Sequence, residues 1–386
     1  AISRRYRERE NHISSDSWPI YISLQKDGIL FKMRRTQDLP DKESATMFFQ
    51  DCKLAHQAQI TGINYSVKEI LPPDLLDLTQ LQKEANIRYG YTASEVYDIA
   101  QSLYEKKLIS YPRTSSRYLT EDVFDSLSPI MARLLSWELF PAAKGTAGID
   151  ISSLSRHVIS AEKANVHHAI IITGIRPGNL SEKEMQVYRL VAGRMLEAFM
   201  APCRIETTNI EAVCAAQHFK AEQTRIIEAG WHDVFMRSDM LPTSGYSVKE
   251  LPEVEKGDPL NVCGCNMVHK KQLPVNPFTD AELVEYMELN GLGTVSSRTN
   301  IIRTLVNRKY IRYSGKYIVP TPKGMFTYET IRGKKIADTS LTADWEKQLA
   351  GLESGMITGQ DFLNRIRTLA KEMTDDIFNT YSTKEE

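Results

Sequence analysis

The 386-residue sequence contains little cysteine, and its five cysteines are scattered except for Cys263 and Cys265. Only one residue separates those two, whereas a zinc ribbon needs two pairs of cysteines, each typically separated by two residues. The pattern therefore argues against a zinc site and predicts structural thiols in a reducing cytoplasm. We expect no metal site among these residues.

Long hydrophobic runs are also missing. No stretch approaches the ~20 apolar residues of a membrane-spanning helix, and the first residues lack the apolar core of a signal peptide. The composition, with 42% hydrophobic and 25% charged residues, is that of an ordinary soluble protein. The length exceeds one compact core, so we expect two to four domains. We also expect a cytoplasmic protein that is a monomer. The chain enters a basic, helical stretch directly at Ala1, which we interpret as the interior of a longer protein.

The chain has no excess of positive charge, since 48 Lys and Arg residues against 49 Asp and Glu residues give a net charge of −1. A DNA-binding domain is usually basic, so the whole-chain value argues against nucleic acid. The distribution argues for it, because residues 298–335 hold ten basic side chains and Glu329 as the one acid. A solvated helix face usually mixes signs. This stretch therefore predicts a nucleic-acid-binding surface.

Alternating hydrophobic residues predict β-structure in two separate parts of the chain. In residues 1–72, two alternating runs flank Lys26-Asp27-Gly28, a strong hairpin signal, and a helix and a further strand follow. Alternation returns in residues 207–273. We interpret both parts as halves of one β-rich arch domain, with the helical residues 73–206 inserted between them. Such an insertion is tolerated because the entropy of closing a loop grows slowly with its length.

Residues 73–206 and 274–386 both have the outline of a winged helix-turn-helix. In the first, Thr92 and Glu95 form a capping box at the start of an amphipathic helix. In the second, the predicted helix Ser296–Lys309 is followed by an alternating hairpin. The predicted fold class is therefore multidomain α+β: a β-rich arch, an inserted helical winged-helix domain, and a second helical winged-helix domain.

The two helical parts also repeat each other in sequence. Placing Thr92 on Thr294 aligns further similar residues: Ser94 with Ser296, Ile99 with Ile301, Leu103 with Leu305, Lys107 with Lys309, Ile109 with Ile311 and Tyr111 with Tyr313. Two winged-helix modules of common origin would explain the match, and the shared pattern of all amphipathic helices is the alternative.

The stretch from Tyr111 to Arg117 carries the residues best suited to chemistry. Pro112 excludes helical dihedral angles at Tyr111 and so holds it beyond the preceding helix. A phenol is a poor nucleophile near neutral pH because its pKa is about 10. A neighbouring guanidinium such as that of Arg113 favours the phenolate and can grip a phosphate, and hydroxyl groups add neutral donors. The residues suit a tyrosine that attacks a phosphodiester, although most tyrosines before proline are packing residues.

This stretch resembles the active-site signature of the type IA DNA topoisomerases, the topoisomerase I/III family, which reads Tyr-Pro-Arg-Thr-Asp-Ser. Ser115 departs from the family's Asp. The segment 166–173 resembles the family's Ala-His-Glu-Ala-Ile-x-Pro-Thr, with His168 in place of the Glu and Ile172 in place of the Pro. Further matches occur in family order at residues 72–86, 100–105, 287–294, 308–311 and 343–346. The lack of zinc ribbons and the run Ser-Arg-Tyr-Leu after the signature favour a bacterial topoisomerase III-like protein.

The resemblance implies a role for each matching residue. Tyr111 would attack a backbone phosphate of single-stranded DNA, expel a 3′-hydroxyl and form a 5′-phosphotyrosyl link. Arg113 would hold the scissile phosphate and stabilise its developing charge. His167 would assist by hydrogen bonding to a phosphate oxygen or a neighbouring acid. Eight further residues would contact DNA: Thr114, Ser116, Arg117, Thr294, Ser296, Ser297, Arg298 and Arg308.

The family's Mg²⁺ ligands, a Glu and an Asp-x-Asp cluster, belong to an N-terminal Toprim domain, which the resemblance places before Ala1. We therefore expect Mg²⁺ in the full-length enzyme and none bound by residues 1–386. The complete enzyme would cleave one strand, pass another through the break and religate it, which relaxes or decatenates DNA. A helicase is a candidate partner. The fragment would bind single-stranded DNA weakly without cleaving or relaxing it.

Two other hypotheses remain. A non-enzymatic DNA-binding protein with tandem winged helices would use the same basic surface and would not need the hydroxyl of Tyr111. A tyrosine recombinase or type IB enzyme needs Arg, Lys and His residues upstream of a C-terminal tyrosine. The position of Tyr111 in the first third of the chain disfavours that third hypothesis.

Overall fold

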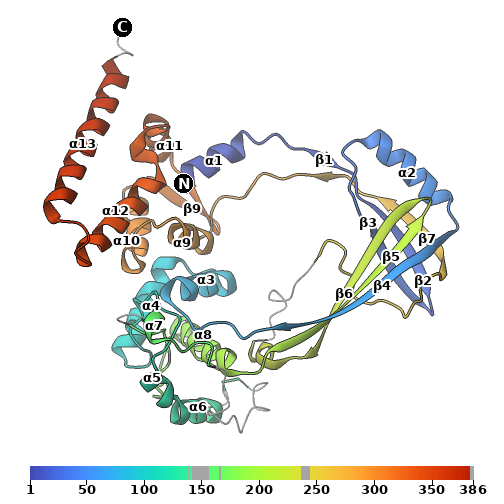
Figure 1. Ribbon diagram of the computed structural model, residues 1–386, viewed down its shortest axis with the longest axis horizontal. Helices are drawn as coiled ribbons and strands as arrows, with labels where there is room; N and C mark the ends of the chain where they lie inside the picture. Colours follow the sequence, from blue (N-terminus) through green and yellow to red (C-terminus); the bar gives the residue numbers. More distant parts are fainter. Residues whose placement is uncertain (138, 141–155, 165–166, 236–243, 383–386) are drawn as a thin grey trace.

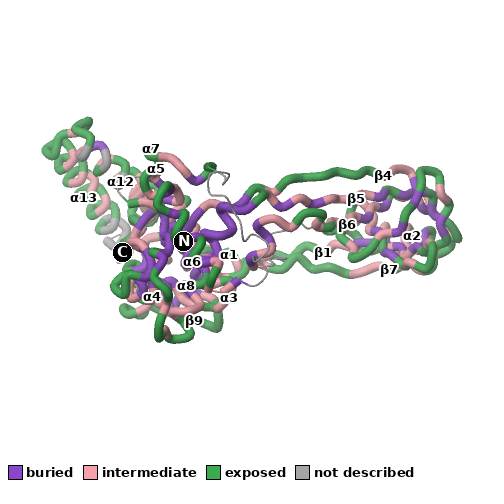
Figure 2. Tube along the Cα trace, turned by 90° about the horizontal axis from the view of Figure 1, so that it is seen from below, coloured by how far each residue is buried: buried purple, intermediate pink, exposed green. Residues whose placement is uncertain are grey.

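The computed structural model describes residues 1–137, 139–140, 156–164, 167–235 and 244–382. These residues form a closed six-stranded β-barrel and two helical parts, which are arranged as a ring in Figure 1. The long strands β4 (Gln57–Ile70), β5 (Cys203–Cys214) and β6 (Gln217–Glu228) run from the barrel to the first helical part. Figure 2 shows these strands passing, mostly exposed or half-buried, between the buried regions at the two ends of the molecule.

The barrel takes three strands from each side of the inserted helical part, in the order β2–β3–β6–β5–β4–β7. β2 (Ile20–Lys26) and β3 (Ile29–Arg35) form the predicted hairpin, because Asp27 and Gly28 both adopt the positive φ angles of a two-residue turn. β7 (Pro259–Met267) closes the barrel against β2 and β4. Strands from both β-rich segments therefore lie in one barrel.

The barrel core follows from alternation along each strand. Ile20, Ile22 and Leu24 are fully buried on one face of β2 and pack with apolar residues of the other strands. α2 (Lys42–Leu54) packs against β2 and β7, and the carboxylate of Asp41 caps its first turn. β1 (Asp16–Ser17) and β8 (Lys270–Lys271) pair between the barrel and the second helical part.

The first helical part packs around one long buried helix, α8 (Glu182–Phe199). Helical structure over residues 121–136 is interrupted at Ser126, whose hydroxyl donates to the carbonyl of Val123. The other helices of this part are α3 (Leu78–Tyr89), α4 (Ala93–Glu105), α5 (Glu121–Asp125), α6 (Leu127–Ser136), α7 (Ala161–Ala164) and the 3₁₀ helix η3 (Gly230–Val234).

The second helical part begins with a capping box formed by Thr279 and Glu282. The predicted hairpin is also present, and α13 projects away from the rest in Figure 1. The elements are α9 (Asp280–Leu289), α10 (Val295–Asn307), β9 (Ile311–Ser314), β10 (Tyr317–Pro320), α11 (Pro322–Ile331), η5 (Lys335–Ala337), α12 (Thr339–Glu353) and α13 (Gly359–Ser382).

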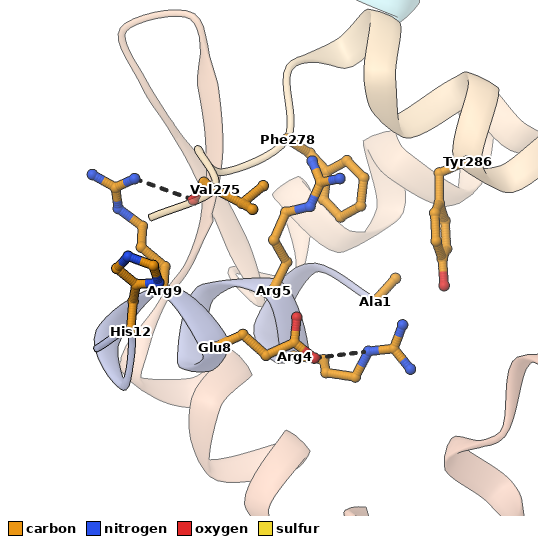
Figure 3. A pocket seen from close by; sticks show the side chains of 9 residues that line it. All are labelled: Ala1, Arg4, Arg5, Glu8, Arg9, His12, Val275, Phe278 and Tyr286. Atoms are coloured by element: carbon orange, nitrogen blue, oxygen red, sulfur yellow. Dashed lines mark hydrogen bonds and ion pairs between the residues drawn. The ribbon is translucent and has the colours of Figure 1, made fainter. Parts of the chain in front are cut away.

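The N-terminal helix α1 (Ile2–Glu10) packs on this second helical part, although the sequence-based division grouped it with the β-rich residues 1–72. The guanidinium of Arg5 lies over the ring of Phe278, 3.5 Å from its centroid (Figure 3). Arg7 forms an ion pair with Glu329 of α11 at 2.7 Å. Hydrophobic alternation could not have revealed this placement, because it depends on contacts with residues late in the chain.

The two helical parts meet where α3 and α4 contact α9 and α10, and Ala93 of α4 is buried in the hydrophobic cluster of the second part. No helix in the part of the chain that the structure describes is long and apolar enough to cross a membrane.

Two positions that the sequence repeat aligns, residues 107 and 309, have the same backbone conformation. Lys107, after α4, and Lys309, after α10, both have a φ angle of 59°, in the left-handed region. The hydroxyl of Thr173 donates to the carbonyl of Lys107, and the hydroxyl of Thr321 donates to the carbonyl of Lys309. Thr173 and Thr321 therefore play equivalent roles in the two modules, although the sequence repeat does not align them.

We predict that Gly324→Ala destabilises the second helical part. A Cβ at this position in the first turn of α11 would stand 2.0 Å from the carbonyl oxygen of Tyr310, so helix and hairpin would have to separate. The free energy of unfolding should fall by about 3 kcal/mol, as measured by urea denaturation. Gly359→Ala is the control, because nothing lies within 4 Å of its added Cβ. Equal stability of the two variants would contradict this packing.

Candidate active site

Tyr111 follows α4 at the end of a segment that is hydrogen-bonded to residues 169–173. Ile109 forms an isolated antiparallel bridge with Ile172. The amide of Ser110 donates to the carbonyl of Ile171 at 2.8 Å, and its hydroxyl accepts from the amide of the same residue at 3.0 Å. These bonds fix the point at which Tyr111 leaves the paired segment.

Three side chains surround the half-buried ring of Tyr111. The imidazole of His167 lies 4.6 Å from it between centroids, and Tyr104 meets it edge-on at 5.4 Å. The guanidinium carbon of Arg113 is 5.1 Å from the ring centroid. The Nε atom of Arg113 is buried and has no hydrogen-bond partner among the described residues. Because an unpaired buried N–H is costly, this arginine is suited to completing its bonds on an anionic ligand.

Thr114 and Ser116, both predicted to contact DNA, are buried and bonded within the protein. Thr114 is 3% exposed and donates its hydroxyl to the carbonyl of His167 at 2.8 Å. Ser116 is 2% exposed and donates to the carbonyl of Lys163, also at 2.8 Å. In this structure the hydroxyl of Thr114 therefore positions His167 beside Tyr111 and is not available to a phosphate. The burial arises from long-range pairing that the local sequence does not encode.

Two predicted DNA contacts, Arg117 and Arg298, converge on one carboxylate. The Nε of Arg117 donates to Asp77 at 2.6 Å, and its Nη2 lies 3.6 Å from Glu288. The Nη1 of Arg298, which is 8% exposed, lies 3.4 Å from the same Glu288. Burial raises the pKa of the Asp77 carboxyl above its usual range, and Arg117 opposes that shift. The sequence prediction missed both acids, although they lie in the matching segments 72–86 and 287–294.

The predicted contacts at the start of α10 lie together at the surface. The amide of Thr294 donates to the hydroxyl of Ser297 at 2.8 Å, and the hydroxyl oxygens of Thr294 and Ser296 are 3.2 Å apart. Unpaired N–H groups at a helix start favour an anion. Arg308 is exposed at the opposite end of this 13-residue helix, roughly 20 Å away, so it is not part of the same group.

Metal ligands do not gather at this site. Within the described ranges, no group of three His, Cys, Asp or Glu side chains is placed to hold a metal ion. Asp77 and Glu288 both face arginines. Mg²⁺ prefers carboxylate and water oxygens, so the residues present do not fit it. All five cysteines are free thiols.

Comparison with known proteins gives these residues a context. A model of the DNA topoisomerase family matches residues 1–364, almost the whole chain. The chain belongs to the DNA topoisomerase family. The DNA topoisomerase 3 of Bacillus licheniformis is 31% identical to this topoisomerase over 344 residues, which cover 83% of this chain and 47% of that protein. The DNA topoisomerase 3 of Shouchella clausii is 30% identical over 383 residues, which cover 91% of this chain and 51% of that protein.

This topoisomerase chain therefore spans about half the length of the curated relatives it matches. The structure of full-length topoisomerase I from Thermotoga maritima matches it with a TM-score of 0.74 over 96% of this chain and 61% of that chain, at 21% identity. That likeness shows a shared fold. Together these matches identify a type IA, topoisomerase III-like protein.

Glu184 anchors the end of α4, from which the chain runs on to Tyr111. Its carboxylate accepts from Lys106 at 2.6 Å and from the hydroxyl of Ser102 at 2.7 Å, and it completes the capping box of α8 with Ser181. Lys106 first, and then the hydrogen bonds of Ser102 and Ser181, lower the pKa of Glu184 to about 2.

We predict that Glu184→Gln lowers the free energy of unfolding by about 2 kcal/mol at pH 7. The native pKa lies below the ordinary value of 4.5, so the stabilisation is complete above pH 4.5 and is lost as the pH falls towards 2. Urea denaturation at a series of pH values should show a flatter acid dependence for Glu184→Gln than for the wild type. Glu182→Gln, on the same helix turn, is the control. An unchanged acid limb in Glu184→Gln would refute the assignment.

Proposed function

We propose that this chain carries the DNA-cleaving tyrosine of a type IA topoisomerase and part of its binding surface for single-stranded DNA. The observation that supports this is the cluster of Tyr111, His167 and Arg113, in which a half-buried phenol lies beside an arginine with an unpaired Nε. The Tyr111 hydroxyl loses its proton as its oxygen attacks the phosphorus, the bond from phosphorus to O3′ breaks, and O3′ takes up a proton, so that no net proton is gained or lost. The product is a 5′-phosphotyrosine, and the reverse reaction restores the strand.

Arg113 and His167 serve this reaction at the phosphate. Arg113 donates to a non-bridging oxygen, where negative charge develops in the transition state. His167 hydrogen-bonds to a phosphate oxygen or a neighbouring acid. The side chain of His167 is exposed and its carbonyl is held by Thr114, so the imidazole can meet a bound strand.

The strand-binding surface includes the second helical part. We propose that α9, α10 and the β9–β10 hairpin act as a winged-helix module, with the segment around Tyr111 as its counterpart in the first helical part. Exposed basic residues at the hairpin end of α10 would contact phosphates without reading sequence. They are Arg308, Arg312, Lys316 and Lys323.

Mg²⁺, when bound, would neutralise charge at the scissile phosphate and at the leaving hydroxyl. Because the residues described do not fit Mg²⁺, we propose that its ligands come from a Toprim domain outside residues 1–386. On this proposal, residues 1–386 bind single-stranded DNA but do not relax it. The complete enzyme would relax or decatenate DNA. It would act in the cytoplasm as a monomer, with a helicase as a partner.

The test uses this chain joined to the Toprim domain of a DNA topoisomerase 3. A single-stranded oligonucleotide labelled at its 3′ end is incubated with Mg²⁺ and trapped with detergent. We expect a labelled covalent adduct with the wild type and none with Tyr111→Phe, because the nucleophile is lost. Tyr104→Phe, which removes a hydroxyl from the neighbouring ring, should retain the adduct.

The other outcomes separate the alternatives. An adduct that persists in Tyr111→Phe would reject Tyr111 as the nucleophile. An adduct that carries only a 5′-end label would indicate a 3′ link and a type IB-like reaction. Binding of single-stranded DNA without an adduct in any variant would favour a non-enzymatic protein with tandem winged helices.

A further inference from the structure

Hydrogen-bond donors from three separate segments of the chain meet at the carboxylate of Glu288. Glu288, on α9, accepts from the hydroxyl of Thr79 on α3 at 3.2 Å. It lies 3.4 Å from the Nη1 of Arg298 on α10 and 3.6 Å from the Nη2 of Arg117, which follows the Tyr111 stretch. A single acid therefore meets two of the arginines that the sequence predicts to contact DNA.

Both arginines are held in place and keep hydrogen-bonding capacity. The Nε of Arg117 is anchored by Asp77, whose side chain is 1% exposed, so the Nη2 of Arg117 is directed across to Glu288. Arg298 is more than nine-tenths buried, and its Nε has no hydrogen-bond partner within the described residues. A guanidinium fixed in this way binds a second planar or tetrahedral anion with little loss of entropy.

The surroundings suit a phosphate as well as a carboxylate. Arg298 lies in the first turn of α10, next to the exposed hydroxyls of Thr294 and Ser296. The start of a helix favours an anion, and carboxylate and phosphate oxygens accept the same two-pronged bonds from arginine. Glu288 itself is partly exposed, with 26% of its side-chain surface accessible, so it can turn away when another anion arrives.

We propose that Glu288 is an internal substitute for a DNA phosphate, which occupies Arg117 and Arg298 until a single strand displaces it. The inference rests on the proposed function, because it takes single-stranded DNA as the ligand of this surface. Displacement also breaks the ion pair between Arg117 in the first helical part and Glu288 in the second. Strand binding thus loosens one contact between the two parts.

The test compares Glu288→Gln with Glu285→Gln in the full chain of residues 1–386. Glu285 is the matched control: it lies on the same helix and pairs with Lys83 across the same contact at 2.5 Å. Binding of a fluorescent single-stranded oligonucleotide is measured by anisotropy from about 50 to about 400 mM KCl. We expect Glu288→Gln to bind roughly fivefold tighter at low salt, with a salt slope steeper by about 0.7, the value of one phosphate contact on a single strand. Glu285→Gln should change affinity less than about twofold.

Thermal unfolding without DNA supplies a second readout. Glu288→Gln should unfold at a lower temperature than the wild type, since it loses ion pairs, while its DNA affinity rises. A purely structural Glu288 would lower both. If Glu288→Gln does not fold, Glu288→Ala with the same expectations replaces it.

Unchanged or weaker binding by the Glu288 variant, or an equal gain in Glu285→Gln, would overturn the inference. If the wild type binds the oligonucleotide and the Glu288 variant binds no tighter, this inference alone fails. If neither the wild type nor Glu285→Gln binds single-stranded DNA, the proposed function fails with it.

Discussion

The hydrogen bonding between residues 109–118 and residues 167–173 is the interaction on which the rest of the site depends. Tyr111 and His167 are far apart in sequence, and their rings meet because Ser110 and Thr114 bond to the facing segment. The same pairing buries the hydroxyls that would otherwise resemble phosphate ligands. A site assembled in this way is only as rigid as the two segments that carry it. The anchoring of α4 and α8 around Glu184 therefore bears directly on where the tyrosine lies.

The contact between the two helical parts has a different character from their interiors. Most buried apolar residues pack within their own part, with Ala93 of α4 joining the cluster of the second part. The contact also includes the ion pairs of Lys83 with Glu285, Arg303 with Asp98, and Arg117 with Glu288. Polar groups exchange such bonds for bonds to water at small net cost. Contacts between domains that move relative to one another are typically polar in this way. The contact thus combines these ion pairs with a few buried groups, such as Ala93 and the hydrogen bond from Gln82 to Thr299.

Local sequence patterns predicted the features that depend on local physics. Asp27-Gly28 specified its hairpin because only a few residues accept the required φ angles, and Thr92 and Thr279 specified helix starts through their own hydroxyls. The partners of Thr114 and Arg117 could not be predicted, because they lie on segments distant in sequence. Glu288 is ten residues before Arg298 but on a separate helix, so only the fold shows that they pair. The same holds for α1, whose contacts are with the end of the chain. Tyr111 was proposed as the nucleophile from the resemblance to a family, since the local sequence alone favours a packing residue.

The ten basic residues of 298–335 show why a charge count differs from a binding surface. Arg298, Arg303, Lys334 and Lys335 are paired with acids from elsewhere in the structure. Within the described ranges, Arg308, Arg312 and Lys316 form no ion pair, and they lie at the hairpin end of α10. Long-range attraction depends on charge that is not already neutralised. A single strand should therefore meet the hairpin end of α10 first and reach the start of α10 afterwards, where it must replace Glu288. On the proposed function, that order would bring the displacement step next to Arg117 and the tyrosine segment, where a backbone phosphate would be held for cleavage.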